Sequence, residues 1–478
     1  MSQPDNKSRQ YQAMEPHWAL PDALMGGTNA MRGSLSLKGR PGSQFLPAHE
    51  GESVERYNAR ARMTFLRNFY KKTLKQLVGR LLQEGVKADA DVPGALAAIL
   101  GDVDLCGNDV SVFAAHLAEC AIHKGGAFVL VDAQDAAAEN LGDQVRVGIR
   151  PYLVSYDLSD VLGVRYDIVG GQEVITQARI RRTREVADGD FGAREVEEIV
   201  VYEPDRIRVY TKAKSGWELT EDRANPAGVV TLVAIGLNPV GPFEYRPALE
   251  TLAEMNLEHF QIRSDQRNAL AVSSFPIPCA SGWDADKDSA IVFGPYNMLA
   301  TSDPQGKFYY LESNGTAVAA GQKELDALED RMTHFGLQFQ AEKVMTATEA
   351  GNEHERATSE LADWGNRIAY GLTQALHFMA LRLGLPQEGK LTIEPPDPVR
   401  QAVVQEADVL LKSRMAGEIS RREYRIEIKR LGVAGEQFDP EAEVEDEQDF
   451  GDTPPEAPPP SNSRLIELAE RALGNAGG

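Results

Sequence analysis

The chain of 478 residues contains only three cysteines, Cys106, Cys120 and Cys279. Three cysteines cannot build the disulfide framework of a small secreted domain, so a reducing environment is expected. The N-terminal stretch MSQPDNKSRQ is polar and lacks the apolar core of a signal peptide. No apolar run approaches the roughly 18 residues that span a bilayer. The sequence therefore predicts a soluble protein that is made in the cytoplasm and has no membrane partner.

Several motifs of catalysis and nucleotide binding are also missing. GxxxxGK[ST] does not occur, which argues against a P-loop NTPase, and neither GxSxG nor a GxGxxG run after a strand is present. His354 and Glu355 are followed by Arg-Ala-Thr, so the second histidine of HExxH is absent. We therefore expect no enzyme and no cofactor. An acidic soluble enzyme whose site is assembled in space is kept as an alternative.

A metal site is disfavoured as well. His116, Cys120 and His123 share one face of a helix predicted from Val110 to His123. His116 and Cys120 could share a zinc ion, but His116 and His123 lie about 10 Å apart along the helix axis. Ligands bind zinc at about 2 Å, so both histidines cannot reach one ion. We expect Cys120 in the core and no metal.

Charge is one-sided but unevenly distributed. The net charge is −22, and the segment from Asp439 to Glu456 holds nine acids and no base. The segment from Arg56 to Leu82 holds eight bases and no acid. An acidic surface repels nucleic acid, which argues against a conventional DNA-binding protein. A helix of this kind could lie on a membrane or on nucleic acid, but we interpret 56–82 as an amphipathic scaffold helix with a basic outer face that includes Arg60 and Arg67.

The most informative stretch runs from Arg246 to Ala271. Pro247 suits the first turn of a helix, and no further proline or glycine follows before Pro276. Such a helix is roughly 40 Å long, which predicts a strut between two parts of the molecule. Acids recur on it at i, i+4 and i+8, a spacing that costs about 0.2–0.5 kcal/mol per like-charge pair. A solvated face and a surface that must not bind a polyanion are both compatible with these acids, which are Glu250, Glu254 and Glu258.

The rest of the chain divides by its periodicity. Residues 145–235 alternate as in an antiparallel sheet of six to eight strands. Between the strut and a returning helix, Gln322 to Phe335, two short strands are predicted at Ala290–Phe293 and Phe308–Glu312. A long helix is predicted from Glu353 to Leu383, and two more helices over 397–431, where Ser420 and Glu423 form a capping box.

Five blocks in this order resemble the portal proteins of tailed bacteriophages. The resemblance covers most of residues 50–445, supported further by TATEAGNEHERATSELADW, and its specificity lies in order and spacing. The blocks are NARARMTFLRNFYKKTLKQLVGRLL; AECAIHKGGAFVLVDAQ; RPYLVSYDLSDVLGVRY; LETLAEMNLEHFQIRSDQRNALAV with FPIPCASGW; and VLLKSRMAGEISRREYRIEIKRLGV with FDPEAE.

The resemblance implies an α+β, portal-type fold with a strand-rich wing, long stem helices, a small β-containing clip and a helical crown. The implied parts are a flexible N-terminal arm (1–45), the wing (46–245), a stem helix (246–271), the clip (272–320), a return stem helix (321–336), a tunnel loop (337–352), a long tunnel or wing helix (353–385), crown-side helices (386–440), an acidic Pro-rich linker (441–462) and a C-terminal helix (463–478).

The implied function is a ring of about twelve copies at the capsid vertex. Double-stranded DNA would pass through it without sequence specificity during packaging and ejection. The implied partners are the large terminase, the head–tail adaptor and the major capsid and scaffold proteins, and the implied location is the portal vertex of the virion. Candidate channel residues are Glu250, Glu254 and Glu258 on the stem and Lys343, Thr346, Thr348 and Glu349 in the tunnel loop.

Two other classes of protein are left open. An adaptor or minor capsid component would lack the arrangement of two long helices with a small strand-containing part between them. An acidic enzyme would form a small oligomer with a convergent pocket. Copy number and a through-hole separate the three. The role of the Pro-rich linker and of the C-terminal helix stays open, as does the face of the stem that lines the channel. The basic helix 56–82 could touch capsid or DNA, and the sequence does not decide which.

Overall fold

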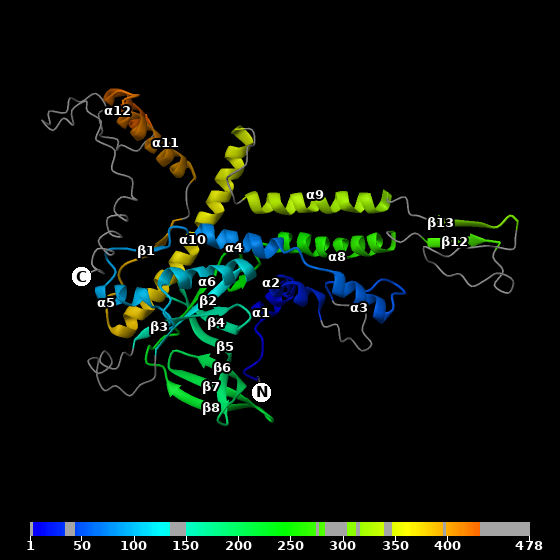
Figure 1. Cartoon of the computed structure of the whole chain (residues 1–478). Coiled ribbons are helices and arrows are strands. Elements are labelled where there is room, and N and C mark those ends of the chain that lie inside the picture. Colours follow the sequence, from blue (N-terminus) through cyan, green and yellow to red (C-terminus); the bar gives the residue numbers. More distant parts are fainter. Residues whose placement is uncertain are drawn as a thin grey trace, which may run out of the picture. The chain divides into compact units, whose positions relative to one another are not determined.

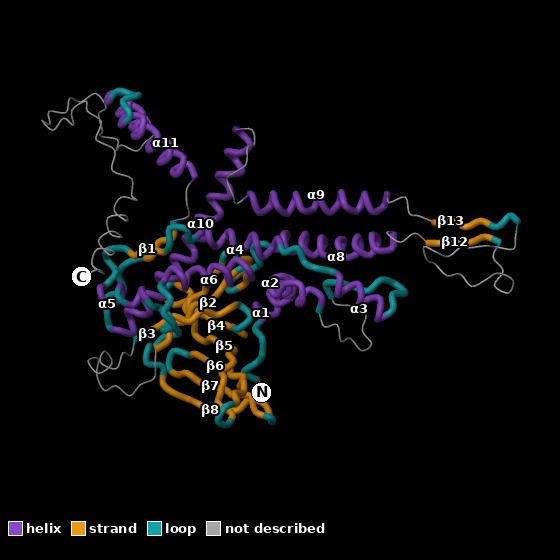
Figure 2. Tube along the Cα trace, in the orientation of Figure 1, coloured by secondary structure: helices purple, strands orange, loops and turns teal. Residues whose placement is uncertain are grey.

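The computed structural model describes residues 3–33, 44–133, 150–273, 277–282, 304–311, 316–338, 347–394 and 398–430. The chain divides into two compact units, residues 1–395 and 396–478, which are described separately. Helices and strands are mixed, so the fold class is α+β (Figures 1 and 2). Within the described ranges, no helix combines the length and the apolarity needed to cross a membrane.

The N-terminal segment is a folded part of the first unit. It contains α1 (Arg9–Met14), the 3-10 helix η1 (Glu15–His17) and α2 (Ala19–Arg32). Tyr11, Met14 and Trp18 are buried, and the Ser8 N–H donates to Leu162 O on the edge of the five-stranded sheet at 2.8 Å. The expectation of a flexible arm over 1–45 is therefore wrong for residues 9–32, because their apolar side chains complete the core.

Two helices replace the single basic helix expected over 56–82. These are α3 (Val54–Met63), which Ser53 caps as expected, and α4 (Phe69–Leu81). The break falls at 64–68 because the Asn68 side chain accepts from Lys71 N–H at 2.8 Å and so caps α4. Arg60 was expected on the outer face, yet it is only 4% exposed and pairs with Glu52 at 2.8 Å. The helix pair is thus anchored by one of its own arginines.

The next segment carries the first strands. Strand β1 (Val86–Ala88) pairs antiparallel with β14 (Leu391–Ile393), and α5 (Gly94–Ala97) and η2 (Ile99–Gly101) follow β1. Helix α6 (Val110–Lys124) leads through Gly125 into β2 (Gly126–Ala133). Gly125 has φ 94°, and a Cβ there would lie 2.0 Å from Arg246 O. Only glycine allows the backbone at Arg246 to pass this close.

The antiparallel strands expected over 145–235 are confirmed where they are described. One sheet has the order β3-β2-β9 and a second the order β4-β5-β6-β7-β8, all antiparallel. The segment 145–149 lies outside the described residues. The strand bounds are β3 (Pro151–Asp157), β4 (Val161–Val169), β5 (Gln172–Asp188), β6 (Gly192–Tyr202), β7 (Arg206–Ala213), β8 (Gly216–Ala224) and β9 (Leu232–Gly236), followed by the small hairpin of β10 (Pro239–Gly241) and β11 (Glu244–Tyr245).

Long helices follow the sheets. Helix α8 (Glu250–Ser273) lies beside α9 (Thr316–Gln338), and the hairpin of β12 (Ile277–Ser281) and β13 (Lys307–Leu311) lies between them in the chain (Figure 1). The strand near 308–312 is confirmed, that at Ala290–Phe293 lies outside the described residues, and β12 was not expected. Helix α10 (Ala347–Leu383) starts six residues before the predicted helix.

Two buried clusters make up the core of the first unit. The larger one surrounds α4, α6, α8 and α10, with Phe260, Leu372 and Leu24 among its members. The smaller one fills the space between the five-stranded sheet and the N-terminal segment, and includes Trp18. The N-terminal segment contributes to both clusters, so it ties them together.

The second unit contains two described helices, α11 (Pro398–Met415) and α12 (Arg421–Arg430). The predicted capping box is confirmed: the Glu423 N–H donates to Ser420 Oγ at 3.2 Å, and the Ser420 N–H donates to Glu423 Oε2 at 2.9 Å. The linker expected at 441–462 and the helix expected at 463–478 lie outside the described residues.

Trp18→Ala tests the docking of the N-terminal segment. Trp18 is 3% exposed and its ring meets Tyr11 edge-on at 5.1 Å. We expect a loss of roughly 3 kcal/mol in the free energy of unfolding, measured by denaturant titration. Asn29→Ala, at an exposed position on α2, is the control and should change it by less than about 0.5 kcal/mol. Equal effects would mean that the segment does not contribute to the core.

Candidate nucleic-acid channel surface

Helices α8 and α9 form an antiparallel pair. Early residues of one contact late residues of the other: His259 Nε2 lies 2.9 Å from Glu329 Oε1, and Gln266 Nε2 donates to Val318 O. Leu325, Leu328 and Met332 on α9 are buried. Where Gln266 meets α9, residue 321 is glycine, and a Cβ there would lie 2.3 Å from Gln266 Oε1. These contacts hold α8 and α9 against each other.

Buried polar side chains hold α8 to the segment that joins α3 and α4. Asn256 is fully buried; its Nδ2 donates to Arg67 O at 2.9 Å, and its Oδ1 accepts from the Tyr70 N–H at 3.1 Å. About two turns further on, Ser264 Oγ accepts from Arg60 Nη1 at 3.1 Å and lies 2.9 Å from Thr64 Oγ1. These bonds fix the rotation of α8 about its own axis and so decide which of its faces is exposed.

His259 joins three elements in one contact. Its side chain is fully buried, Glu329 accepts from its Nε2, and Glu329 also pairs with Arg67. Burial lowers the pKa of His259, and Glu329 only partly offsets this. Protonated Nδ1 would have no acceptor, because this buried nitrogen has no hydrogen-bond partner among the described residues. Burial raises the pKa of Glu329, but hydrogen bonds from Arg67 and His259 outweigh burial, so its pKa is lowered.

The three acids predicted on the strut differ in their surroundings. Glu250 Oε1 lies 2.6 Å from His17 Nδ1, so this acid binds the N-terminal segment. Glu254 and Glu258 are exposed, and within the described ranges no ion pair engages either one. The Asp265 side chain lies on the same helical face as these two and contacts His49 Nε2 at 3.0 Å. We call Glu254 and Glu258 the acidic face of α8.

The predicted tunnel loop is shorter than expected. Helix α9 extends to Gln338 and α10 begins at Ala347, so of the predicted 337–352 only 339–346 lie between the two helices, and these lie outside the described residues. Thr348 and Glu349 therefore belong to the first turn of α10. Lys343 and Thr346 lie outside the described residues.

The pair considered for zinc is a contact between neighbours on α6. His116 Nε2 lies 4.0 Å from Cys120 Sγ, and Cys120 packs against the larger cluster. Burial raises the pKa of the Cys120 thiol to about 12, which disfavours the thiolate that binds zinc. In the part of the chain that the structure describes, no three potential ligands gather around a common point.

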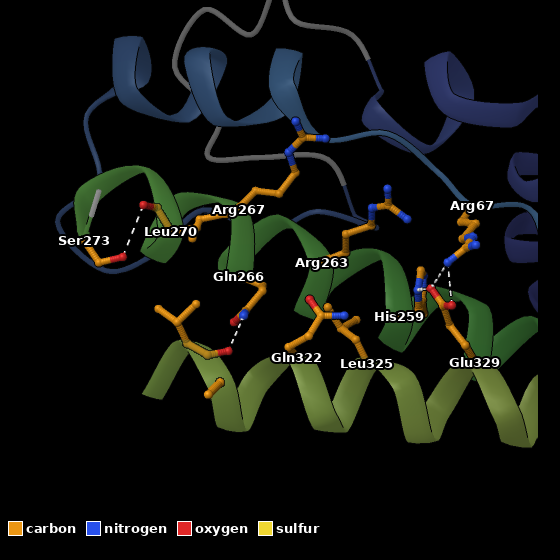
Figure 3. A pocket seen from close by; sticks show the side chains of 12 residues that line it. Arg67, His259, Arg263, Gln266, Arg267, Leu270, Ser273, Gln322, Leu325 and Glu329 are labelled. Atoms are coloured by element: carbon orange, nitrogen blue, oxygen red, sulfur yellow. Dashed lines mark hydrogen bonds and ion pairs between the residues drawn. The ribbon is translucent and has the colours of Figure 1, made fainter. Parts of the chain in front are cut away.

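A groove between α8 and α9 was not expected from the sequence. It encloses about 650 Å³ and opens to solvent. Figure 3 shows Arg67, Arg263 and Arg267 along one edge, and Gln322, Leu325 and Glu329 on the side of α9. The sequence contains one indication of this groove, the spacing of Arg263 and Arg267 at i and i+4 on α8. Arg67 is far from them in sequence, and only the fold brings it to the same groove.

Comparison with known proteins gives limited matches. A family model described as "Domain of unknown function (DUF4055)" matches residues 248–381, which is less than half of the chain. No curated protein matches. The matched residues 248–381 include all of α8 and α9 and nearly all of α10, so the matched region coincides with the long helices.

Three solved structures contain chains with a partial likeness to this one. A chain of "Virion of native gene transfer agent (GTA) particle" is 12% identical, with a TM-score of 0.39, and the match covers 87% of this chain and 99% of that one. A chain of "Neck of native GTA particle computed with C12 symmetry" is 11% identical at 0.37, covering 76% and 89%. A chain of "Neck of empty GTA particle computed with C6 symmetry" is 12% identical at 0.39, covering 76% and 90%. TM-scores of this size define neither fold nor function.

Acidification should loosen the contact of α8 with α9. Because the pKa of His259 is lowered from 6.5, the unfolded state binds a proton first as the pH falls below about 6.5, and stability is lost. The contribution of Glu329 is present above its unfolded value of 4.5 and is lost as the pH falls through its lowered folded pKa. We expect the denaturant midpoint to fall between about pH 7 and pH 5.

His259→Gln isolates the histidine term, since glutamine keeps a donor for Glu329 and does not titrate. The difference in denaturant midpoint between pH 7 and pH 5 should be smaller in this variant than in the unmodified chain. His334→Gln, at an exposed position on α9, is the matched control. An unchanged pH slope in His259→Gln would assign the pH dependence to other groups.

Proposed function

We propose that the chain is a phage portal protein, the subunit of a ring at the capsid vertex through which DNA enters and leaves. The observation that carries this proposal is the strut–hairpin–strut arrangement: α8, the β12–β13 hairpin and the antiparallel return of α9. The order of a strand-rich block, this arrangement and then a 37-residue helix is the order of the parts in the resemblance set out above. Under the proposal, these parts are wing, stem, clip and tunnel helix.

The acidic face suits a surface along which DNA slides. Exposed carboxylates repel phosphates, whereas a basic lining would hold DNA by releasing counterions at every contact. Glu254 and Glu258 are our candidates for this lining. Glu250 is a weaker candidate because His17 engages its carboxylate. Lys343, Thr346, Thr348 and Glu349 remain candidates for contacts with DNA near the start of α10.

The remaining parts of the proposal concern partners. A heterologous contact repeated around an axis closes into a ring, here of about twelve copies. The clip would contact the large terminase during packaging and the head–tail adaptor afterwards, and the capsid and scaffold proteins would surround the ring. The energy for translocation would come from the terminase.

Electron microscopy in negative stain, with native mass spectrometry of the same sample, tests the ring. We expect rings of about twelve subunits with a central hole wide enough for a DNA duplex. If the isolated chain is monomeric, scaffold and capsid proteins are added and the vertices of the assembled shells are examined. A closed dimer or tetramer without a hole would contradict the proposal and favour the enzyme alternative.

Glu254→Lys combined with Glu258→Lys tests the lining in assembled particles. Each lysine adds a phosphate contact, so DNA should be retained in the channel and packaging should fall several-fold, measured as nuclease-protected DNA per particle. Glu185→Lys with Glu195→Lys, an exposed pair on β5 and β6, makes the same charge change and should leave packaging unchanged. Normal packaging in rings of the first variant would remove the acidic face from the lining.

A further inference from the structure

The groove between α8 and α9 has a charge opposite to that of the chain as a whole. Three arginines and one glutamate line it, while the chain carries a net charge of −22. Glu329 already pairs with Arg67 and with His259. Arg263 and Arg267 have no ion pair anywhere in the described ranges. Both arginines line the groove, so an anion bound there would meet their guanidinium groups.

The floor of the groove is apolar. Leu270, Val318, Ala319 and Leu325 line it, and Leu270 is 51% exposed although it is large and apolar. An exposed leucine next to Arg267 is unfavourable in water and gains from being covered. A small inorganic anion would not cover it. The groove therefore fits a ligand that has both carboxylate or phosphate groups and apolar groups.

An acceptor on the wall distinguishes polypeptide from nucleic acid. Gln322 Nε2 donates to Asp326 Oδ1 at 2.8 Å, which leaves its carbonyl oxygen as an acceptor beside the groove. A peptide backbone offers N–H donors, whereas the sugar–phosphate backbone of DNA offers none. Arginine also binds carboxylates through two parallel hydrogen bonds. These features favour an acidic segment of a protein.

The position of the arginines on α8 sets where this ligand would approach. Arg263 follows Glu254 by nine residues, and Arg267 follows Glu258 by nine. Nine residues are two and a half helical turns, so each arginine lies on the opposite side of α8 from its acid. If the acidic face lines the channel, which rests on the proposed function, the groove faces the outside of the ring.

We propose that this groove binds an acidic, amphipathic segment of a second protein on the outer surface of the stem. Arg263 and Arg267 bind its carboxylates, Leu270 and Leu325 contact its apolar side chains, and the Gln322 carbonyl accepts from its backbone. Arg67 supplies a third charge without leaving Glu329.

Fluorescence anisotropy of a labelled synthetic peptide in which Glu and Leu alternate tests the groove on the purified full-length chain. Arg263→Gln with Arg267→Gln should weaken binding by about tenfold or more. Arg194→Gln with Lys214→Gln, two exposed positions near hairpin turns of the five-stranded sheet, removes the same charge and should change the affinity less than twofold. Equal effects of the two variants would overturn the proposal.

A variant of Leu270 and a set of competitors test the nature of the ligand. Leu270→Glu places a carboxylate beside Arg267 at an exposed position and should abolish binding of the peptide while the thermal midpoint is unchanged. Inorganic tripolyphosphate and a short DNA duplex are added as competitors, and a peptide with Gln in place of Glu as a control. If the duplex or the tripolyphosphate displaces the peptide better than unlabelled peptide does, the site binds phosphate and the proposal is wrong.

The assay separates this proposal from the proposed function. Peptide binding is read on whatever oligomer the purified chain forms, so a closed dimer or tetramer without a hole would contradict the portal function and leave the groove assay valid. Conversely, rings that bind no peptide would leave the portal function standing and overturn only the groove.

Discussion

The fixed rotation of α8 is the constraint on which the other features depend. The buried side chains of Leu252 and Phe260 already place one side of α8 in the core, while its acids and arginines lie on other sides. Asn256 and Ser264 fix the rotation of α8 about its axis, because their buried hydrogen bonds to the α3–α4 segment form in one rotation only. Each such bond contributes about 1 kcal/mol net, and losing one partner costs more because the other stays buried. This exceeds the repulsion between Glu254 and Glu258.

Long elements with regular periodicity could be predicted from the sequence, and short elements that depend on distant contacts could not. Strands such as β3 and β7 alternate in burial over part of their length, which gives a period of two, and α8 contains no proline or glycine. The end of α3 carries no such signal. Asn68 caps α4 while its Nδ2 donates to Leu24 O at 2.6 Å, so the break is fixed partly by a residue far away in sequence.

The same limit applies to the candidate site. The acidic face is visible as a spacing along one helix, but the engagement of Glu250 by His17 is not, because His17 is over two hundred residues earlier. Strand β12 could not be predicted from the sequence, because Pro276 and Pro278 surround its start and proline disfavours strands. In a two-stranded hairpin both strands are edges, so Pro278 can lie opposite Tyr310 without removing an internal hydrogen bond.

The pairing of β1 with β14 has a consequence for biosynthesis. Val86 lies opposite Ile393, so about three hundred residues separate the two partners. During translation, β1 leaves the ribosome long before β14 exists, and its edge stays open while the sheets and the long helices are made. Strand β14 lies almost at the end of the first unit, so this sheet forms only when nearly the whole unit has been made. The chain therefore completes its fold after the acids and arginines of α8 have been made. A chain interrupted before residue 391 retains an unpaired edge on β1.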